Sequence, residues 1–487
     1  MALAQLPLLY PLLALAAGVI AVLLTGMSPA KGRAPRTLII ALLFLAFAAL
    51  LALRFPQDGA IGDLIQVDAF SRFFLWLAMI AAALVLILAT QSVELSQDRF
   101  PEFTALLLTI VIGISLMAAA RNLLMAYLAM EMVSYASYIL TGFKRANIFS
   151  HEAALKYVIF GGVASGVMLF GISLLYGLTG SMGFSAIAAA LTQSGPVLAA
   201  GKNGMLAALI ALVMILTGLG FKTAAVPFHM WSPDVYQGAP TPFTGFLSVA
   251  PKAAGFALML RFFTALLPQS GPDLRTLLFI LLGMISAITM TLGNLTAIHQ
   301  SNIKRLLAYS SIAHAGYMLM GVALIDQIGA GAVLLYLGIY LVMNLGAFAA
   351  VQIVADKQGS EEIADYRGLG YRAPLLGFVL SVYLFSLAGL PPLAGFIGKF
   401  FLFAALIHNS GFWYIALAFV GILNSVVGLF YYTRIMREMY MGSHEDAPRW
   451  KVALAPLLVV LVLPIFFLGL YWVPLQNWAL AAVQALQ

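Results

Sequence analysis

Ionisable side chains inside apolar segments are the features of this chain that could carry chemistry. Four lysines (Lys156, Lys222, Lys252 and Lys399) and one glutamate, Glu131, lie within long apolar runs. An ionisable group at membrane depth costs about 3 kcal/mol even on the lenient insertion scale, so such groups are rare and mark functional sites. Five of them in one chain predict a route for charge.

Glu131 and Lys222 are expected to act together. Burial disfavours the charged form of a lysine, whereas a nearby carboxylate favours it. A lysine whose carboxylate partner approaches and withdraws can therefore load and release a proton. Glu131 is the acidic residue that lies deepest in an apolar run, which makes it the natural partner of Lys222. The alternative is a static Lys–Glu pair that only holds two helices together.

The other lysines are candidate proton carriers along the membrane plane. Lys252 lies in the middle of its run, and Lys399 follows a predicted helix break. Lys156 lies nearer the end of its run, where a long side chain can extend its charged group to the interface. An interfacial position is the alternative for all three lysines; it suits Lys156 best and Lys252 least.

Histidines extend the set of candidates. His229 and His314 lie in apolar runs, and histidine relays protons readily because its unperturbed pKa is near neutral. The alternative is a hydrogen-bonded structural role. No two histidines are one helical turn apart, so their spacing predicts no metal site. Ser310 and Ser311, close to His314, could hydrogen-bond a file of water or join helices.

The elements that must position these residues are membrane-spanning helices. The 487 residues are 63% hydrophobic and 9% charged, with a mean hydropathy of +1.01, which is too apolar to cover the surface of a soluble protein. No polar stretch is long enough for a soluble domain, so we expect one all-α polytopic bundle in a lipid bilayer. About 14 stretches have the length needed to cross a hydrocarbon core. The expected spans are 5–26, 37–54, 69–90, 103–120, 122–142, 152–178, 204–231, 241–267, 274–298, 303–325, 328–355, 373–408, 412–436 and 452–472.

Cofactor chemistry has no visible site in the sequence. The chain contains no cysteine, which excludes thiolate-ligated iron–sulfur clusters and disulfides. It also lacks a GxGxxG after a strand, a P-loop and an HExxH motif, so we expect no cofactor and no metal in this chain. The net charge of +7 is explained by its distribution between loops, and no nucleic-acid partner is expected.

Basic residues in the loops predict the orientation in the membrane. With both termini outside and 14 crossings, 15 Lys or Arg residues fall on the inner side and 6 on the outer side, as the positive-inside rule requires. The acidic loop 91–102 argues the other way. The inner set is Lys31, Arg33, Arg36, Arg99, Lys144, Arg145, Lys304, Arg305, Lys357, Arg367, Arg372, Arg434, Arg437, Arg449 and Lys451; the outer set is Arg54, Arg72, Arg121, Lys202, Arg261 and Arg275.

The chain partly repeats itself. A shift of 179 places residues 134–142, SYASYILTG, over residues 313–321, AHAGYMLMG. Each unit would hold five helices, and an odd number inverts the second unit in the membrane. The alternative is chance similarity between apolar helices. The expected divisions are an N-terminal part at 1–101, the two repeats at 102–268 and 269–440, and a C-terminal helix at 441–487.

Prolines interrupt corresponding helices of the two units. Pro227 and Pro233 lie within the seventh span, and Pro391 and Pro392 lie within the twelfth. Proline removes a backbone donor and clashes with the preceding turn, so both helices are expected to break. Broken helices at equivalent positions indicate a transport path near the bilayer midplane, and kinks that serve packing are the alternative.

Three stretches give the chain a family resemblance. They run LLAYSSIAHAGYMLMG at 306–321, GLPPLAGFIGKF at 389–400 and FKTAAVPFHMWSPDVYQGAP at 221–240. These stretches resemble the antiporter-like membrane subunits of NADH-quinone oxidoreductase, respiratory complex I. The histidine in the first stretch and the lysine in the second favour the subunit N group. The similarity spans the fourth to thirteenth helices, about two-thirds of the chain.

The resemblance implies roles for the residues that match. Glu131 corresponds to the family's glutamate on the fifth helix, and Lys222 to its lysine on the seventh. Lys252 matches the connecting lysine of the eighth helix, and Lys399 the terminal lysine of the twelfth. Lys156 matches a further basic position on the sixth helix.

The resemblance further implies a translocase subunit that holds no redox cofactor itself. NADH, FMN, iron–sulfur clusters and quinone would belong to partner subunits, and other membrane subunits of the complex would lie beside this chain in a bacterial inner membrane. Quinone reduction elsewhere would drive protons along the buried Lys, Glu and His side chains. Two alternatives stay open: a subunit of a multi-subunit cation/proton antiporter, which shares the broken-helix motifs, and a non-conducting membrane scaffold.

Overall fold

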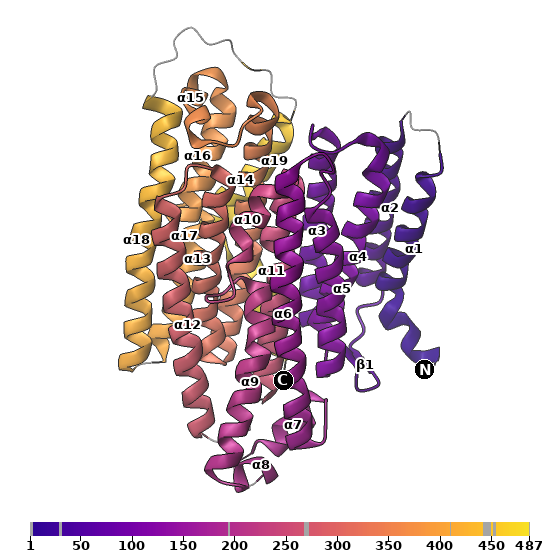
Figure 1. The fold of residues 1–487 in the computed structure, drawn as a ribbon, viewed down its shortest axis with the longest axis vertical. Helices are drawn as coiled ribbons and strands as arrows, with labels where there is room; N and C mark the ends of the chain where they lie inside the picture. Colours follow the sequence, from indigo (N-terminus) through magenta and orange to yellow (C-terminus); the bar gives the residue numbers. More distant parts are fainter. Residues whose placement is uncertain are drawn as a thin grey trace.

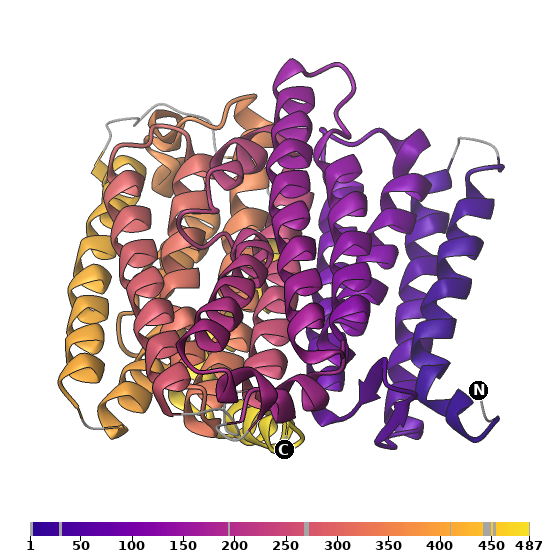
Figure 2. The same ribbon diagram turned by 60° about the horizontal axis from the view of Figure 1, so that its bottom comes forward.

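The protein is a bundle of long helices that run side by side (Figures 1 and 2). The structure is a computed structural model and describes residues 3–28, 32–192, 195–266, 272–409, 411–441, 450 and 454–486. The α-helices are α1 Tyr10–Thr25, α2 Arg33–Arg54, α3 Ala69–Gln91, α4 Phe100–Ala119, α5 Leu123–Thr141, α6 Ile148–Thr179, α7 Phe184–Ala190, α8 Pro196–Ala199, α9 Lys202–Thr223, α10 Trp231–Gly238, α11 Thr241–Leu266, α12 Pro272–Ile298, α13 Ile303–Leu324, α14 Gln327–Gln358, α15 Leu369–Arg372, α16 Pro374–Ala388, α17 Ala394–His408, α18 Phe412–Met441, α19 Ala455–Leu470 and α20 Val473–Gln484.

Only short elements interrupt this helical pattern. The strands β1 Gly59–Ile61 and β2 Ile65–Val67 form an antiparallel hairpin in which Ala60 lies opposite Gln66. The 3-10 helices are η1 Leu3–Leu9, η2 Gln97–Arg99 and η3 Ile363–Tyr366.

The helices provide the crossings that the hydropathy pattern predicts. Within the described residues, twelve helices are long and apolar enough to span a membrane. Helix α19, taken together with α20, against which it is bent by 80°, makes a thirteenth candidate span, and α16 and α17 are shorter apolar helices. The prediction of an all-α polytopic bundle is confirmed, with 12 or 13 candidate spans among the described residues where about 14 were predicted. Both ends of the chain lie toward the same end of the bundle, as an even number of crossings requires (Figure 1).

Asparagine and aspartate residues begin several helices, and three of these, α5, α6 and α13, hold candidate residues. Asp68 caps α3, Asn122 caps α5, Asn147 caps α6, Asn302 caps α13 and Asp326 caps α14, each through a side-chain oxygen that accepts from a first-turn amide. Such caps satisfy amides that have no partner within the helix and contribute about 1 kcal/mol each.

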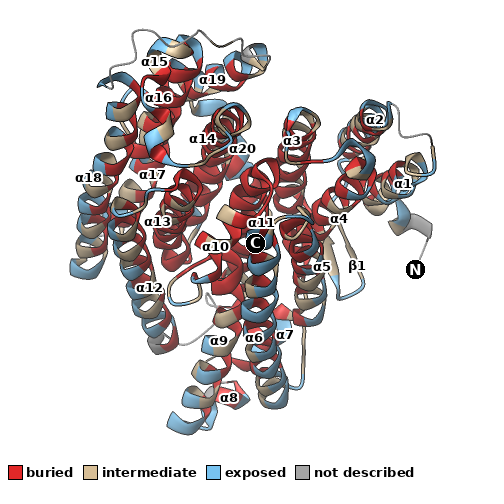
Figure 3. Cartoon of the chain, turned by 45° about the horizontal axis from the view of Figure 1, so that its top comes forward, coloured by how far each residue is buried: buried red, intermediate tan, exposed pale blue. Residues whose placement is uncertain are grey.

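Burial divides the bundle into a centre and a periphery (Figure 3). The apolar window of α11 is entirely buried inside the protein, and those of α13 and α14 are 94% and 89% buried, whereas α2 and α18 each have 28% buried. A helix that is apolar on all sides belongs in a core or a membrane. The polar residues in the central part of α11, α13 and α14 are therefore shielded from both lipid and water.

Two helices are broken and run in opposite directions. The seventh span divides into α9 and α10 at residues 224–230, and the twelfth divides into α16 and α17 at residues 389–393. Each first half ends at a left-handed residue, Ala224 with φ of 57° and Gly389 with φ of 89°. In Figure 1, α9 lies below α10 whereas α16 lies above α17, which is the arrangement that inverted repeats produce.

Three details differ from the sequence expectation. Lys304 and Arg261 were assigned to loops, but they lie within α13 and α11 and are buried. Both are paired with carboxylates, which composition alone does not reveal. The GxxxG pattern at Gly162 and Gly166 predicts close helix packing, yet both glycines are exposed and a Cβ there would meet no neighbouring atom within 4 Å. That packing prediction is wrong within this chain, because the pattern faces outward.

Candidate functional site

Three of the candidate lysines form the buried part of the site. Lys222, Lys252 and Lys399 are 2%, 1% and 5% exposed, and they lie on α9, α11 and α17. No carboxylate lies within 4 Å of any of the three ammonium groups in the described structure. Their hydrogen-bond partners are instead neutral oxygen atoms.

Lys222 lies in the last turn of α9, directly before the first break. Its Nζ donates to the Oγ of Ser134 on α5 at 3.1 Å. Glu131, one turn earlier on α5, is half-buried and accepts a hydrogen bond from the Ser165 hydroxyl of α6. The expected direct Lys–Glu pair is therefore absent from this conformation. The hydroxyl of Ser134 accepts the hydrogen bond from Lys222 that the carboxylate of Glu131 was expected to accept.

Lys252 lies at the centre of the fully buried α11. Its Nζ donates to Ser311 Oγ of α13 at 2.6 Å, and Ser311 Oγ lies 3.3 Å from the hydroxyl of Tyr236. The same Nζ lies 5.6 Å from the centroid of the Tyr236 ring, where the ring face attracts a cation. The Ser311 hydroxyl can donate to a neutral amine or accept from an ammonium group, whereas the ring face favours the ammonium group.

Lys399 occupies the second break. Its Nζ donates to the carbonyl of Ala388, the last residue of α16, at 2.8 Å and to Ser425 Oγ of α18 at 2.9 Å. It also lies 4.8 Å from the centroid of the Tyr317 ring on α13. A carbonyl freed by a helix break needs a partner inside a membrane, and Lys399 supplies it.

His314 joins three helices through hydroxyl groups. Its Nδ1 lies 2.5 Å from Tyr336 OH of α14, and its Nε2 lies 3.2 Å from Tyr432 OH of α18. Tyr432 OH in turn lies 2.5 Å from Ser310 Oγ, the neighbour of the serine that Lys252 contacts. Helix α13 thus carries a row of polar side chains from the Lys252 site to the Lys399 site.

The remaining two candidates lie outside this network. His229 is 7% exposed, and its Nδ1 has no hydrogen-bond partner among the described residues. Lys156 has a side chain that is 38% exposed, and it pairs with Glu152 at 2.7 Å and Asp234 at 2.6 Å. Surface pairs of this kind contribute little to stability. Lys156 is therefore not a buried lysine like the other three.

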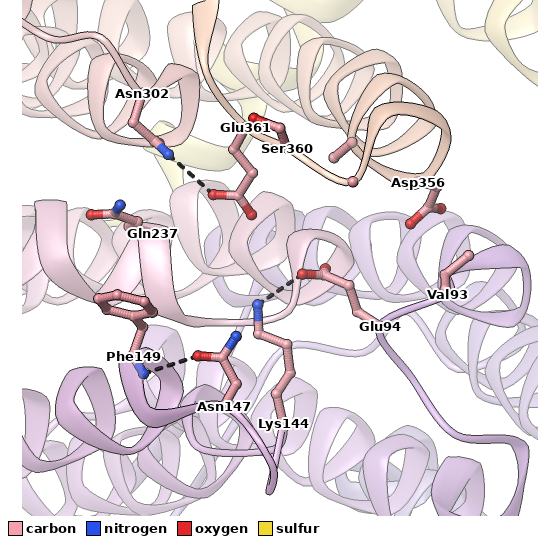
Figure 4. A pocket seen from close by; sticks show the side chains of 12 residues that line it. Val93, Glu94, Lys144, Asn147, Phe149, Gln237, Asn302, Asp356, Ser360 and Glu361 are labelled. Carbon is pink, nitrogen blue, oxygen red and sulfur yellow. Dashed lines mark hydrogen bonds and ion pairs between the residues drawn. The ribbon is translucent and has the colours of Figure 1, made fainter. Parts of the chain in front are cut away.

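A polar cavity of about 420 Å³ lies where α3, α5 and α14 end, which is an odd number of crossings from the N-terminus, and Figure 4 shows its lining residues. Glu94 in its wall accepts from Lys144 Nζ at 2.8 Å and from the Thr241 amide at 2.6 Å. Nearby, the fully buried Lys304 donates to Glu361 at 2.8 Å. The sequence did not single out these residues, because they occupy loops and helix ends where charges are ordinary.

The charges around Glu94 hold it ionised. Burial alone raises the pKa of this carboxyl, but the positive charges of Lys304 and Lys144 and the hydrogen bonds from Lys144 and Thr241 lower it to about 2. One of the acidic residues in the loop that argued against the predicted orientation is thus paired with a basic residue.

Glu94→Gln is expected to destabilise the folded subunit in a pH-dependent way. A depressed pKa contributes stability that is complete above the unfolded value near 4.5 and is lost as the pH falls toward 2; the shift corresponds to on the order of 3 kcal/mol. The difference in thermal unfolding temperature between native and variant proteins should therefore shrink from pH 7 to pH 4. Glu438→Gln, whose native carboxylate lies 3.6 Å from Arg437 at the surface, serves as the control. An equal difference at both pH values would contradict the assignment.

A second buried ion pair ties α11 to the start of α3. Arg261 Nη2 donates to both carboxylate oxygens of Asp68 at 2.8 and 2.9 Å, and its Nε donates to the Ala118 carbonyl at 2.6 Å. The pair links α11 with α3 and α4. Among the described residues, no group of three or more His, Cys, Asp or Glu side chains could hold a metal ion.

Comparison with known proteins assigns this arrangement to a family. The family described as NADH:quinone oxidoreductase/Mrp antiporter, TM, matches residues 120–425. NADH-quinone oxidoreductase subunit N of Anaeromyxobacter sp. (strain Fw109-5) is 46% identical over 90% of this chain and 88% of that protein. A chain of respiratory complex I from Thermus thermophilus is 34% identical with a TM-score of 0.78, covering 96% of this chain and 98% of that one.

The fold is shared more widely. A chain of the Mrp complex from a Dietzia species has a TM-score of 0.80 at 20% identity and covers 100% of this chain and 98% of that one. The multi-span architecture, the two oppositely directed breaks and the extent of these similarities lead to one assignment. This chain belongs to the NADH:quinone oxidoreductase/Mrp antiporter membrane family, within the subunit N group of NADH-quinone oxidoreductases.

Proposed function

We propose that the buried lysines of this proton-translocating subunit are the groups that carry the protons, driven by quinone reduction in partner subunits. The observation that supports this most directly is the environment of Lys222, Lys252 and Lys399, which are almost completely buried and bonded only to neutral oxygens. Burial favours the neutral amine in such a place, and an approaching negative charge favours the ammonium group. The lysine therefore changes its charge when a neighbouring charge moves.

The route begins at Lys222 and continues through α13. Glu131 changes the proton affinity of Lys222 by moving toward it or away from it. The contact between Ser134 and Lys222 already holds α5, the helix of Glu131, next to the lysine. The proton then passes to Lys252 and along the hydroxyls and imidazole of α13 to Lys399. His229 and His314 were both candidates for this route. We assign the role to His314, because it contacts tyrosines on two further helices.

The chain contributes no redox chemistry of its own in this proposal. NADH, flavin, iron–sulfur clusters and quinone belong to partner subunits of the oxidoreductase, and this subunit responds to charge changes that neighbouring membrane subunits pass on. We place both termini on the outer side of the bacterial inner membrane, so that the polar cavity with Glu94 and Lys144 faces inward.

Lys222→Ala in the assembled complex tests the proposal. The variant is expected to oxidise NADH but to translocate fewer protons per electron, because the first carrier is missing. The measurement is the acidification of inverted membrane vesicles together with quinone reduction. Undiminished translocation per electron would remove Lys222 from the route.

The family also contains cation/proton antiporters, and the shared fold favours such exchange as the second candidate function. Reconstituted complex distinguishes the two, because an antiporter subunit would make proton movement depend on Na⁺ or K⁺. A non-conducting scaffold predicts instead that buried lysines become methionine with effects on stability alone.

A further inference from the structure

Two buried asparagines lie between α12 and α18, outside the proposed route. Asn294 is 1% exposed and Asn424 is 7% exposed, and α12 packs against both α13 and α18 (Figure 1). Asn294 Nδ2 donates to the backbone carbonyl and to the side-chain oxygen of Asn424, each at 3.1 Å. Asn424 Nδ2 donates back to Thr291 Oγ1 of α12 at 3.1 Å. The two amides therefore join α12 to α18 in both directions.

Tyrosine hydroxyls complete the hydrogen bonding of Asn294. Its Nδ2 also donates to Tyr317 OH of α13 at 3.3 Å, and its Oδ1 accepts from Tyr431 OH of α18 at 3.0 Å. The polar atoms of this side chain thus all have partners. A fully bonded polar cluster in a low-dielectric interior fixes one arrangement of the helices that supply it.

This cluster leads to the terminal lysine of the proposed route. Tyr317, whose hydroxyl accepts from Asn294, lies with its ring centroid 4.8 Å from Lys399 Nζ. Asn424 directly precedes Ser425, whose Oγ accepts from the same Nζ at 2.9 Å. Two groups that contact the Lys399 amine are thus held in place by the asparagine pair.

The orientation of the Tyr317 ring determines how well it attracts a cation. A ring face attracts a cation within about 6 Å of its centroid, whereas the ring edge is positive and does not. The ring packs against His314 and Phe403, with centroids 5.8 and 6.5 Å away, but neither contact restrains the hydroxyl. Among the described residues only Asn294 hydrogen-bonds that hydroxyl, so it sets the angle at which the ring faces Lys399.

We propose that Asn294 and Asn424 are positioning residues for Lys399. They hold the Tyr317 ring and the Ser425 hydroxyl where both contact the amine, and they bind no proton themselves. The inference rests on the proposed function in treating Lys399 as a proton carrier. It adds that an aromatic face, oriented by a buried amide, stabilises the charged form of this carrier.

Fluorinated tyrosines at position 317 test the inference in the assembled complex. Fluorine withdraws electron density from the ring face, so each added fluorine weakens the attraction for an ammonium group. Tyrosines with one or two fluorines on the ring carbons farthest from the hydroxyl replace Tyr317, in the native background and in Asn294→Leu. The measurement is the rate of proton translocation relative to NADH oxidation in inverted vesicles.

The dependence on fluorine is expected to disappear when Asn294 is replaced. Two fluorines should lower translocation about tenfold in the native background, the effect of losing roughly 1.4 kcal/mol of a cation–π contact. In Asn294→Leu they should lower it by less than about twofold, because the ring no longer faces Lys399. Asn424→Leu should act in the same way, since Asn294 then loses two of its acceptors.

Asn344→Leu is the matched control. Asn344 is also a fully buried amide that donates to a side-chain hydroxyl, that of Ser248, but it lies on α14. Its substitution is expected to leave the dependence on fluorine unchanged. If the Asn294→Leu complex does not assemble, Asn294→Ser replaces it, because the serine side chain is too short to reach the Tyr317 hydroxyl.

The outcomes separate this inference from the proposed function. An equal dependence on fluorine in the native and Asn294→Leu complexes would overturn the inference, since Asn294 would then be structural only. A loss of the dependence in Asn344→Leu as well would do the same. So would a native complex that is insensitive to fluorine although Lys399→Met abolishes translocation. Normal translocation in Lys399→Met would instead contradict the proposed function, and the inference would fall with it.

Discussion

Replacing Lys252 with methionine is expected to lower the rate of coupled proton translocation by about 100-fold or more, the typical effect of removing a positioned proton-transfer group. Methionine fills a similar volume in the fully buried α11 but cannot bind a proton. The hydroxyl of Ser311 loses its donor at 2.6 Å but keeps Tyr236 as a neighbour. The substitution therefore removes the proton-binding group and changes the local packing little. Vesicle acidification, compared with NADH oxidation in the same membranes, measures the effect.

Lys156→Met is the matched control for this experiment. The same substitution at a lysine that is 38% exposed and held by two surface carboxylates is expected to change translocation less than twofold, an effect of roughly 0.4 kcal/mol that lies within the range of surface ion pairs. Equal losses in both variants would contradict the distinction between a buried carrier and a surface pair. Normal translocation in Lys252→Met would exclude Lys252 from the route.

Arg261→Met is expected to destabilise the subunit by about 3–5 kcal/mol, because it leaves Asp68 charged and buried without its partner. The arginine makes two hydrogen bonds to that carboxylate and one to the Ala118 carbonyl, and all three would be lost. The amount of subunit in membranes and the thermal unfolding temperature of the purified complex should both fall.

A second change should restore much of this loss. Asp68→Asn removes the unpaired charge while its side-chain oxygen still caps α3 at the Ser71 amide. The double variant is therefore expected to be more stable than Arg261→Met alone. Arg72→Met, which breaks an exposed pair with Asp58 at 2.6 Å, is the control and should cost less than about 1 kcal/mol. A double variant no more stable than the single one would show that the uncompensated charge is not the cause.

Sequence reasoning succeeded where a local rule determines the structure. Proline removes a backbone donor from a helix, so the breaks near Pro227 and Pro391 were predictable, although Pro251 lies within the unbroken α11. The division of the chain into spans was predictable from the apolar runs. The charge of a lysine within an apolar run is equally visible. These features depend on residues close to one another in the chain.

The partners of the buried charges could not be predicted in the same way. Ser134 and Ser311 are ordinary helix residues until α9 and α11 pack against them, and Asp68 meets Arg261 only because α3 and α11 are neighbours in space. The Glu131–Lys222 pair was expected because opposite charges attract, yet a serine hydroxyl contacts each group in this conformation. The terminal helix α20 was missed because its 80° bend against α19 follows from packing.

The contact between Lys399 and the Ala388 carbonyl connects the charge of the lysine to the distance between α16 and α17. This carbonyl is the free end of α16, where the helix dipole is negative, so it holds an ammonium group more tightly than a neutral amine. Linkage between the two equilibria then works in both directions. On the proposed route, a proton that arrives on Lys399 would draw α17 toward α16, and a force that pulls these half-helices apart would help the proton to leave. The separation of the two half-helices at the second break would therefore depend on the protonation state of one lysine.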